Sequence, residues 1–194
     1  QWYLDQAAGL PERTEPLPPV PSTFQARARN TMRNGLSSAL MRPYFPYYRT
    51  HRPHSFILES AAWCWKLLMG QREAERSAAT WEAVKGQPYF TLPLQLNSDY
   101  QIRVHSPFGD MRAALRFVIK SFAEHAPQGV ALLVKRHPLD PGLVGWERLT
   151  RKLAAHYGVG ERVHYLSDWD IAQVVQTSLG VVTVNSTVGT LALN

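Results

Sequence analysis

The chain has 194 residues, of which 45% are hydrophobic and 19% are charged, a balance typical of a soluble globular chain with enough apolar side chains for a core. No stretch approaches the roughly 18 unbroken apolar residues of a membrane-spanning helix. The single cysteine, Cys64, excludes an internal disulfide and fits a reducing compartment. The formal net charge of +6 favours anionic partners such as phosphates, nucleotides, lipid head groups or nucleic acid.

The positive charge is concentrated in the first third of the chain. Between Phe24 and Pro53 there are six arginines and no acidic residue. The arginines are Arg27, Arg29, Arg33, Arg42, Arg49 and Arg52. A negatively charged surface partner would therefore contact this part of the chain.

The elements predicted before Pro88 are irregular or helical. Residues 1–22 contain closely spaced prolines, which predict an irregular loop. Residues 24–40 predict a basic helix, and residues 54–66 have apolar side chains at helical spacing. Residues 71–83 continue as a helix or a surface connection until Gly86-Gln87-Pro88 breaks the pattern.

Strands and helices alternate after Pro88. Strands are predicted at 89–96, 130–134, 163–166 and 180–184. Helices are predicted at 111–122 after the N-cap Asp110, at 143–157 up to Gly158, at a short segment through Val175 capped by Asp168 or Asp170, and from Ser186 onward. Pro93 places the first strand near a sheet edge or puts the proline at a strand end.

This alternation predicts an α/β fold with a doubly wound parallel sheet, incomplete in this chain. We expect residues 1–85 to be a mainly helical and irregular piece of a preceding domain, and residues 86–194 to be a Rossmann-like domain that is truncated at its C-terminus. The chain begins in a loop and ends within a predicted helix, so we expect a fragment of a longer protein.

Polar residues follow three of the predicted strands. The first strand is followed by Gln95, Asp99 and Gln101, and then by Arg103, His105 and Ser106. The second is followed by Lys135, Arg136 and His137, and the fourth by Asn185, Ser186 and Thr187. Ligands of open α/β sheets bind at the carboxyl ends of the strands. The basic cluster after the second strand suits an anionic ligand such as a phosphate, although a solvated basic strand end has the same sequence.

Two of these strand ends suggest specific chemistry. Asn185-Ser186-Thr187-Val188-Gly189 at a helix start would present hydroxyl and backbone N–H groups to a phosphate; ordinary N-capping by Ser186 or Thr187 explains the same residues. Asp99 could act as a nucleophile or base in a basic cleft. It could equally be a turn residue, because Asn97-Ser98-Asp99 is typical of a turn.

The sequence does not predict a metal centre. His51 and His54 are three residues apart, but Pro53 between them breaks a helix and a third ligand is not evident. The nucleotide-binding glycine motifs, the paired-cysteine motif and the nucleophile-elbow motif are also absent from the sequence.

Four stretches together resemble the bacterial capsule polysaccharide biosynthesis proteins that act as β-Kdo transferases, above all those that begin the poly-Kdo linker of the capsule. The stretches are Pro93 to Ile102, His105 to Phe108, Lys135 to Pro138, and Val182 to Gly189. The likeness is strong from Tyr89 to Asn194 and weak in the first third.

The resemblance implies a GT-B-like glycosyltransferase in which residues 86–194 are the donor-binding half and residues 1–85 end the acceptor half. It implies CMP-Kdo as the donor, retention of configuration, and no separate cofactor. It also implies a phospholipid or glycolipid acceptor. The location would be cytoplasmic, and contact of the arginine-rich third with an anionic inner-membrane surface is a hypothesis.

The resemblance also implies roles for individual residues. Asp99 and His137 would be catalytic, with Asp99 as the carboxylate at the sugar and His137 at the CMP phosphate. The substrate-binding residues would be Gln95, Gln101, Lys135, Asn185, Ser186 and Thr187. A departing phosphate gains negative charge, which His137, Lys135 and a helix N-terminus would stabilise.

Two other functions remain open from the sequence. Another CMP-sugar transferase, such as one for sialic acid, would share the phosphate site, and a donor screen would separate it from a Kdo transferase. A non-enzymatic nucleic-acid-binding protein would use the arginine-rich third and bind with a steep salt dependence. The sequence disfavours nucleic acid as a partner because no known binding motif is present.

Overall fold

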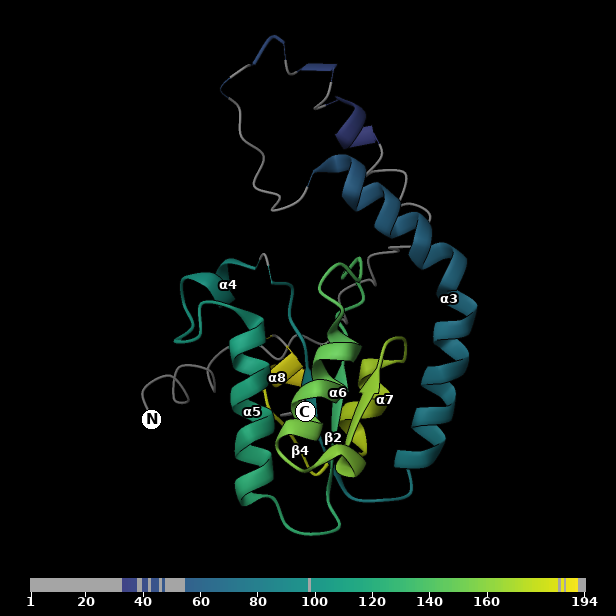
Figure 1. Cartoon of the computed structure of the whole chain (residues 1–194), viewed down its shortest axis with the longest axis vertical. Helices are drawn as coiled ribbons and strands as arrows, with labels where there is room; N and C mark the ends of the chain where they lie inside the picture. Colours follow the sequence, from purple (N-terminus) through teal and green to yellow (C-terminus); the bar gives the residue numbers. More distant parts are fainter. Residues whose placement is uncertain are drawn as a thin grey trace, which may run out of the picture. The chain divides into compact units, whose positions relative to one another are not determined.

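The computed structural model describes residues 33–37, 40–41, 43–45, 47, 55–97, 99–184, 186 and 188–191 (Figure 1). The chain divides into two compact units, residues 1–46 and residues 47–194. In the first unit, residues 33–37 are helical. The predicted loop at 1–22, most of the predicted basic helix, and all of the six arginines except Arg33 lie outside the described residues.

The second unit contains a four-stranded, entirely parallel sheet. Its strands are β1 (Tyr89–Pro93), β2 (Ala131–Lys135), β3 (Val163–Leu166) and β4 (Gly180–Val181), in the order β3-β2-β1-β4. This is the order of the first four strands of a Rossmann fold. The predicted α/β class and parallel sheet are therefore confirmed.

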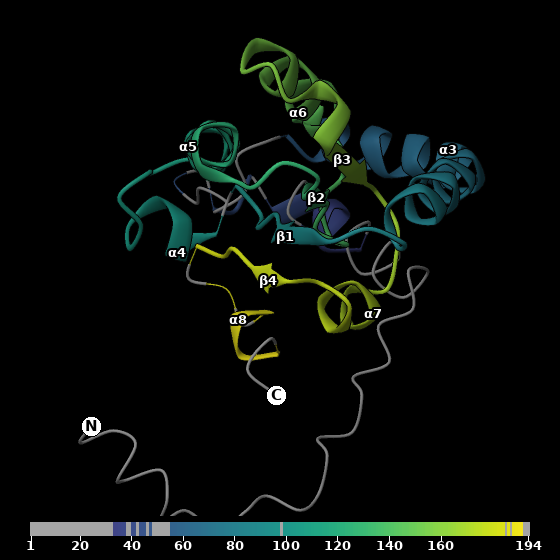
Figure 2. The same ribbon diagram turned by 90° about the horizontal axis from the view of Figure 1, so that it is seen from below.

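Helices cover both faces of the sheet. They are α3 (Phe56–Val84), α4 (Tyr100–Arg103), α5 (Met111–His125), α6 (Trp146–His156), α7 (Ile171–Gln176) and α8 (Val188–Leu191), with a 3-10 turn at Gly160–Arg162. Figure 2 shows α5 and α6 on one side of the strands and α7 on the other. The C-terminal end of α3 packs with α7, because Trp81, Val84 and Val174 belong to the same core cluster.

Successive side chains of β2 alternate between the two faces of the sheet, so the core has one layer on each face. Leu132 and Val134 pack among the side chains of α5 and α6, whereas Ala131 and Leu133 pack against Trp81 and its neighbours. Successive side chains of a strand point to opposite faces of a sheet, so a strand buried on both faces is apolar throughout. This explains why residues 130–134 form one continuous hydrophobic run.

The helix before the sheet is longer and more continuous than the sequence indicates. α3 has 29 residues, and the Ser55 side chain accepts a hydrogen bond from the Leu58 N–H to cap it. It lies in the second compact unit, with Trp81 and Val84 buried. The assignment of residues 1–85 to a preceding domain stays a prediction.

β4 is shorter than predicted, and Pro93 supplies a physical reason. The carbonyls of Tyr89 and Thr91 accept hydrogen bonds from the Leu179 and Val182 N–H groups on the β4 side. Pro93, two residues further along β1, faces the same way and has no N–H to donate. The ladder ends there, so only residues 180–181 of the predicted strand 180–184 pair with β1.

Most predicted helix boundaries agree with the structure. Asp110 caps α5 by accepting a hydrogen bond from the Arg112 N–H. Asp170, not Asp168, caps α7. α6 begins at Trp146, three residues after the predicted start, because Gly145 with a φ of 66° ends a turn immediately before it. Within the described residues, no helix is long and apolar enough to cross a membrane.

Candidate functional site

A pocket of about 350 Å³ opens at the carboxyl ends of the strands. It is lined by Pro93, Leu94, Gln95, Asp99, Gln101, Lys135, Arg136, His137, Pro138, Asp168, Trp169, Ile171, Ser186 and Val188. The chain order reverses between β1 and β4, because β2 and β3 lie on one side of β1 and β4 on the other. Ligands of open α/β sheets bind at such a switch point.

The structure brings together every described residue that the sequence proposed for the site. Gln95, Asp99 and Gln101 come from the end of β1, Lys135 and His137 from β2, and Ser186 from the segment after β4. Asn185 and Thr187 lie outside the described residues. The pocket therefore fits the expectation that three strand ends converge, while the role of each residue stays a prediction.

Asp99 combines the two alternatives that the sequence left open. It is the N-cap of α4, and its Oδ1 accepts a hydrogen bond of 3.0 Å from the Gln101 N–H. It also lines the pocket. Capping fixes the direction of the carboxylate, because the side chain must remain over the first turn of α4. The short helix α4 itself was not predicted.

His137 is held in one orientation by the loop that carries it. Its Nδ1 lies 3.1 Å from the Leu139 backbone nitrogen, whose N–H donates to the ring. A neutral imidazole with Nδ1 as an acceptor carries its proton on Nε2. The Leu139 N–H thus selects the tautomer in which Nε2 is a hydrogen-bond donor, which suits contact with an anion.

Lys135 contributes a buried positive charge to the wall of the pocket. Its side chain is buried, and Nζ donates to the Arg136 carbonyl at 2.9 Å and the Ser167 carbonyl at 3.4 Å. Burial lowers the pKa of Lys135 to about 8, against the opposing influence of the Asp168 carboxylate, which raises it. The ammonium is therefore largely charged at neutral pH and acts on the pocket through the electric field.

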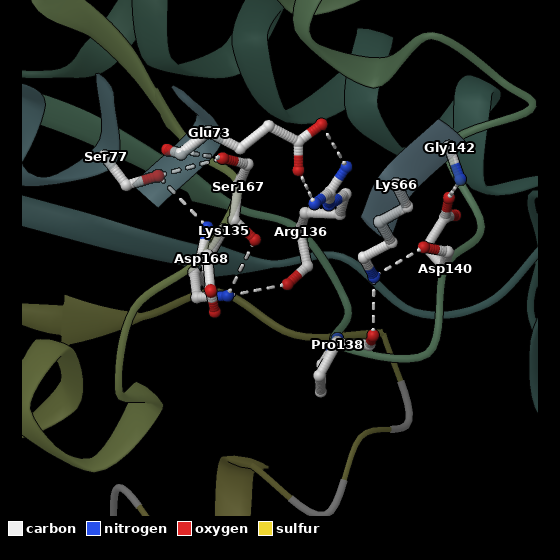
Figure 3. A network of polar contacts seen from close by, with 10 residues as sticks. All are labelled: Lys66, Glu73, Ser77, Lys135, Arg136, Pro138, Asp140, Gly142, Ser167 and Asp168. Atoms are coloured by element: carbon white, nitrogen blue, oxygen red, sulfur yellow. Dashed lines mark hydrogen bonds and ion pairs between the residues drawn. The ribbon is translucent and has the colours of Figure 1, made fainter. Parts of the chain in front are cut away.

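Arg136 points toward α3, unlike its two neighbours in the sequence. Both terminal nitrogens of the guanidinium contact the Glu73 carboxylate of α3, Nη1 at 3.3 Å from Oε1 (Figure 3). The arginine is 6% exposed. This ion pair compensates the buried charge, so the Arg136 guanidinium is committed to holding α3 against the sheet.

A second residue of α3 holds the loop between β2 and α6. Lys66 Nζ donates to the Pro138 carbonyl at 2.9 Å and the Asp140 carbonyl at 3.0 Å (Figure 3). The Asp140 carboxylate accepts hydrogen bonds from the Trp146 Nε1–H at 2.7 Å and the Gly142 N–H at 2.6 Å. Burial, followed by the nearby Arg136 charge, lowers the pKa of Lys66 to about 8. The loop carrying His137 is therefore fixed from two sides.

Ser186 occupies the start of the last described helix. Its Oγ accepts a hydrogen bond of 3.2 Å from the Val188 N–H, which is the capping role that the sequence left open beside phosphate binding. Its hydroxyl proton can still be donated, because a hydroxyl is both donor and acceptor. Gly189 packs closely here, since a Cβ would lie 3.3 Å from Thr183 Oγ1 and would displace it by a few tenths of an ångström.

The sequence did not identify the contribution of β3. Asp168, Trp169 and Ile171 follow this strand and line the pocket. The strand was predicted, and the rule that parallel strands end at one edge would have included its end as well. The α3 residues Lys66 and Glu73 had no such signal, because they are about 70 residues away from the loop they contact.

Arg103 and His105 are absent from the pocket lining. The His105 ring lies against the Tyr100 ring with their centroids 5.4 Å apart. The Ser106 hydroxyl donates to the Ile102 carbonyl at 2.6 Å and accepts from the Phe108 N–H, which stabilises the turn after α4. His105 and Ser106, which the sequence grouped with the end of the first strand, thus contact α4 and the turn after it.

The pocket as a whole combines two carboxylates, an imidazole, a hydroxyl and a buried ammonium. Such a set can bind an anionic group and stabilise negative charge that develops on it, while a carboxylate nearby can stabilise or attack an electron-poor carbon. Within the described parts of the chain, no group of three His, Cys, Asp or Glu residues is arranged to hold a metal ion.

Comparisons with known proteins give a consistent result. A family model described as "Capsule polysaccharide biosynthesis protein" matches residues 1–194. Capsule polysaccharide modification protein LipB from Neisseria meningitidis serogroups A and B is 31% identical over 193 residues, which are 97% of this chain and 46% of LipB. Capsule polysaccharide export protein KpsS from Escherichia coli is 33% identical over 152 residues, which are 77% of this chain and 39% of KpsS. No solved structure matches the chain significantly.

Proposed function

Because this chain belongs to the capsule polysaccharide biosynthesis protein family, we propose that it is the donor-binding part of a retaining glycosyltransferase. The enzyme transfers Kdo from CMP-Kdo to a phospholipid or glycolipid acceptor. The chain spans about half the length of the curated relatives it matches, so the activity, the acceptor and the GT-B-like arrangement of two domains are proposals for the whole protein. Residues 1–85 would then belong to the acceptor half.

The observation that carries this proposal is the meeting of Asp99, His137 and Ser186 in one pocket at the switch point of the sheet. A CMP-sugar has one phosphate and an anomeric carbon beside it. The site needs donors for the phosphate and a carboxylate for the carbon, and these groups come from different strand ends. The family relationship supports a role in capsule synthesis, and the pocket chemistry supports the reaction type.

In the first step, an Asp99 oxygen attacks the anomeric carbon and the bond from that carbon to the phosphate oxygen breaks. The bonding electron pair leaves with CMP. The negative charge that develops on the phosphate is stabilised by the His137 Nε2–H, the Ser186 hydroxyl and the field of the Lys135 ammonium. The covalent intermediate replaces one difficult displacement by two easier ones.

In the second step, a hydroxyl of the acceptor attacks the same carbon, the bond to Asp99 breaks, and the hydroxyl proton passes to the CMP phosphate. Two inversions give net retention. Gln95 and Gln101 line the pocket beside Asp99, where their amides can bind sugar hydroxyl and carboxylate groups.

The decisive experiment replaces Asp99 by Asn in the complete protein and measures CMP release and Kdo transfer from CMP-Kdo. Asn caps a helix about as well as Asp, so α4 is preserved while the nucleophile is lost. We expect a loss of roughly 10³-fold in turnover with an unchanged unfolding midpoint. Near-normal turnover of Asp99→Asn would contradict the proposed mechanism.

Two substitutions of His137 test its separate nitrogens. His137→Asn keeps an acceptor near the position of Nδ1 for the Leu139 N–H but removes the group at Nε2, whereas His137→Gln keeps a donor near Nε2. We expect His137→Gln to retain more CMP affinity than His137→Asn, because phosphate contact is assigned to Nε2. A higher CMP affinity in His137→Asn than in His137→Gln would contradict contact between the phosphate and Nε2.

The same complete protein allows the other substrates and partners to be tested. A screen of CMP-Kdo against CMP-sialic acid separates the two donor sugars, which the pocket lining does not distinguish.

We propose contact of the arginine-rich first third with an anionic membrane at the cytoplasmic face. Binding to liposomes should then rise with anionic lipid content and fall with salt, and binding that ignores both would contradict membrane contact.

A further inference from the structure

The end of β3 contributes a carboxylate to the pocket that the proposed reaction does not use. Asp168 is exposed and lines the pocket. In the part of the chain that the structure describes, no hydrogen bond or ion pair ends on its carboxylate oxygens, and its backbone N–H donates to Ser77 Oγ at 3.1 Å. The carboxylate and the buried Lys135 ammonium attract each other electrostatically. Asp168 therefore offers acceptor oxygens to whatever enters this end of the pocket.

The neighbouring Trp169 is fixed in place. Its ring stacks on Trp81 of α3 with the centroids 5.5 Å apart and the planes 29° from parallel. Its Nε1–H donates to Gln173 Oε1 at 2.9 Å. The hydroxyls of Ser77 and Ser167 are 2.8 Å apart just before it (Figure 3). Packing and hydrogen bonds thus hold Asp168 and Trp169 on a well-braced loop, which lowers the entropic cost of binding.

The order of the strands shows which part of a nucleotide would reach this end. β3 lies on the far side of β2 from β1, and neighbouring strands are about 4.8 Å apart, so the ends of β3 and β1 are separated by about 10 Å. With the phosphate between the ends of β2 and β4 and the sugar at Asp99, the end of β3 remains for the nucleoside. A nucleoside is long enough to reach it.

We propose that Asp168 and Trp169 form the nucleobase subsite and that Asp168 selects cytosine by accepting a hydrogen bond from its exocyclic amino group. This inference rests on the proposed function, which supplies a cytidine nucleotide as the ligand. An ionised carboxylate can only accept hydrogen bonds, and pairing of Asp with the cytosine amino group is an established mode of base recognition. Uracil has a carbonyl oxygen at the same position and would be repelled. Trp169 packs against the base without distinguishing the two.

The experiment measures the affinities of CMP and UMP by calorimetry for the complete protein and for Asp168→Asn. We expect the unchanged protein to prefer CMP, and the ratio of the two affinities to fall about tenfold in Asp168→Asn. Asn can present an N–H group to the uracil carbonyl, so UMP affinity should hold or rise. The ratio of the CMP affinity to the UMP affinity is the essential readout, because removing a negative charge strengthens the binding of both anions equally.

Asp170→Asn is the matched control. It removes one negative charge two residues away, and Asn preserves the cap of α7 that Asp170 provides through the Ala172 N–H. We expect its CMP to UMP ratio to equal that of the unchanged protein. An equal fall in Asp170→Asn would make the effect a general one of charge and overturn the base assignment.

The outcomes separate this inference from the proposed function. If the unchanged protein binds CMP selectively and Asp168→Asn keeps the same ratio, the nucleobase subsite is wrong and the transferase proposal stands. If Asp168→Asn weakens CMP and UMP equally, Asp168 accepts hydrogen bonds from the ribose hydroxyls, and base selection is wrong. If the unchanged protein binds no CMP, both proposals fail.

Discussion

The loop after β2 has one side toward α3 and another toward the strand-end pocket, and charged groups are used differently on the two sides. Toward α3, the Arg136 guanidinium pairs with Glu73, and Lys66 donates to two loop carbonyls. Toward the pocket, His137 of this loop and Asp168 after β3 line a space of about 350 Å³. The difference teaches that a basic cluster in a sequence can be divided between holding the fold and meeting a ligand.

Breaking the ion pair on the α3 side should give the largest effect on stability. Arg136→Met leaves the Glu73 carboxylate without its partner in a mostly buried position, so we expect the free energy of unfolding to fall by about 3 kcal/mol. Urea unfolding of the complete protein measures this. The double variant Arg136→Met with Glu73→Gln should recover at least half of the loss, because no unpaired charge remains; a full loss in the double variant would contradict this account.

The two buried lysines should make stability depend on alkaline pH. The pKa values of Lys66 and Lys135 are lowered to about 8 in the folded chain from 10.5. Between these values the unfolded state binds more protons, so stability rises as the pH increases from 8 toward 10. Above about 10 the raised pKa values of Tyr89 and Tyr165 oppose the trend, because there the folded state retains more protons.

Urea midpoints at pH 7, 8, 9 and 10 test this dependence. Lys66→Met removes one of the two titrating groups, and we expect the slope between pH 8 and 10 to be smaller than in the unchanged protein. A second variant, Lys66→Arg, keeps a cation on α3 that stays charged throughout this range. A slope that is the same in all three proteins would show that Lys66 does not titrate near 8.

On the pocket side, Ser186→Ala should reduce ligand affinity with little loss of stability. The substitution removes a hydroxyl donor for the phosphate, and a hydrogen bond to a charged group is worth enough for CMP affinity to fall about tenfold. Calorimetry with CMP measures the effect. Ser186→Thr restores a hydroxyl and should restore the affinity, whereas equal weakening by Thr and Ala would point to a packing defect around α8.

The smallest effects are expected at the turn after α4. Arg103 and His105 do not line the pocket, so Arg103→Ala and His105→Ala should leave CMP affinity within about twofold. Calorimetry under the same conditions as for Ser186 makes the values comparable. A decrease beyond fivefold in either variant would mean that the ligand extends past the pocket toward this turn, and the division between the two regions would have to be redrawn.

Several features of the fold could be predicted because they depend on local sequence. The apolar run at 130–134 and the caps Asp110 and Gly158 mark a strand and two helix ends through short-range steric and hydrogen-bonding preferences. The pocket residues Asp99, His137 and Ser186 could be proposed as a group because parallel strands end at one edge of a sheet. The end of β4 could not, since it depends on Pro93 in the neighbouring strand β1.

The sequence by itself determined the alternation of strands and helices, the parallel sheet, and which strand ends carry polar groups, because each follows from a periodicity or a motif within a few residues. Tertiary structure alone decided that Arg136 turns to Glu73 while His137 faces the pocket, and that Lys66 holds the loop that follows them. These outcomes depend on α3 packing beside β3, a contact between segments about 90 residues apart. Such contacts form only when the whole sheet buries its two faces, so no local pattern records them.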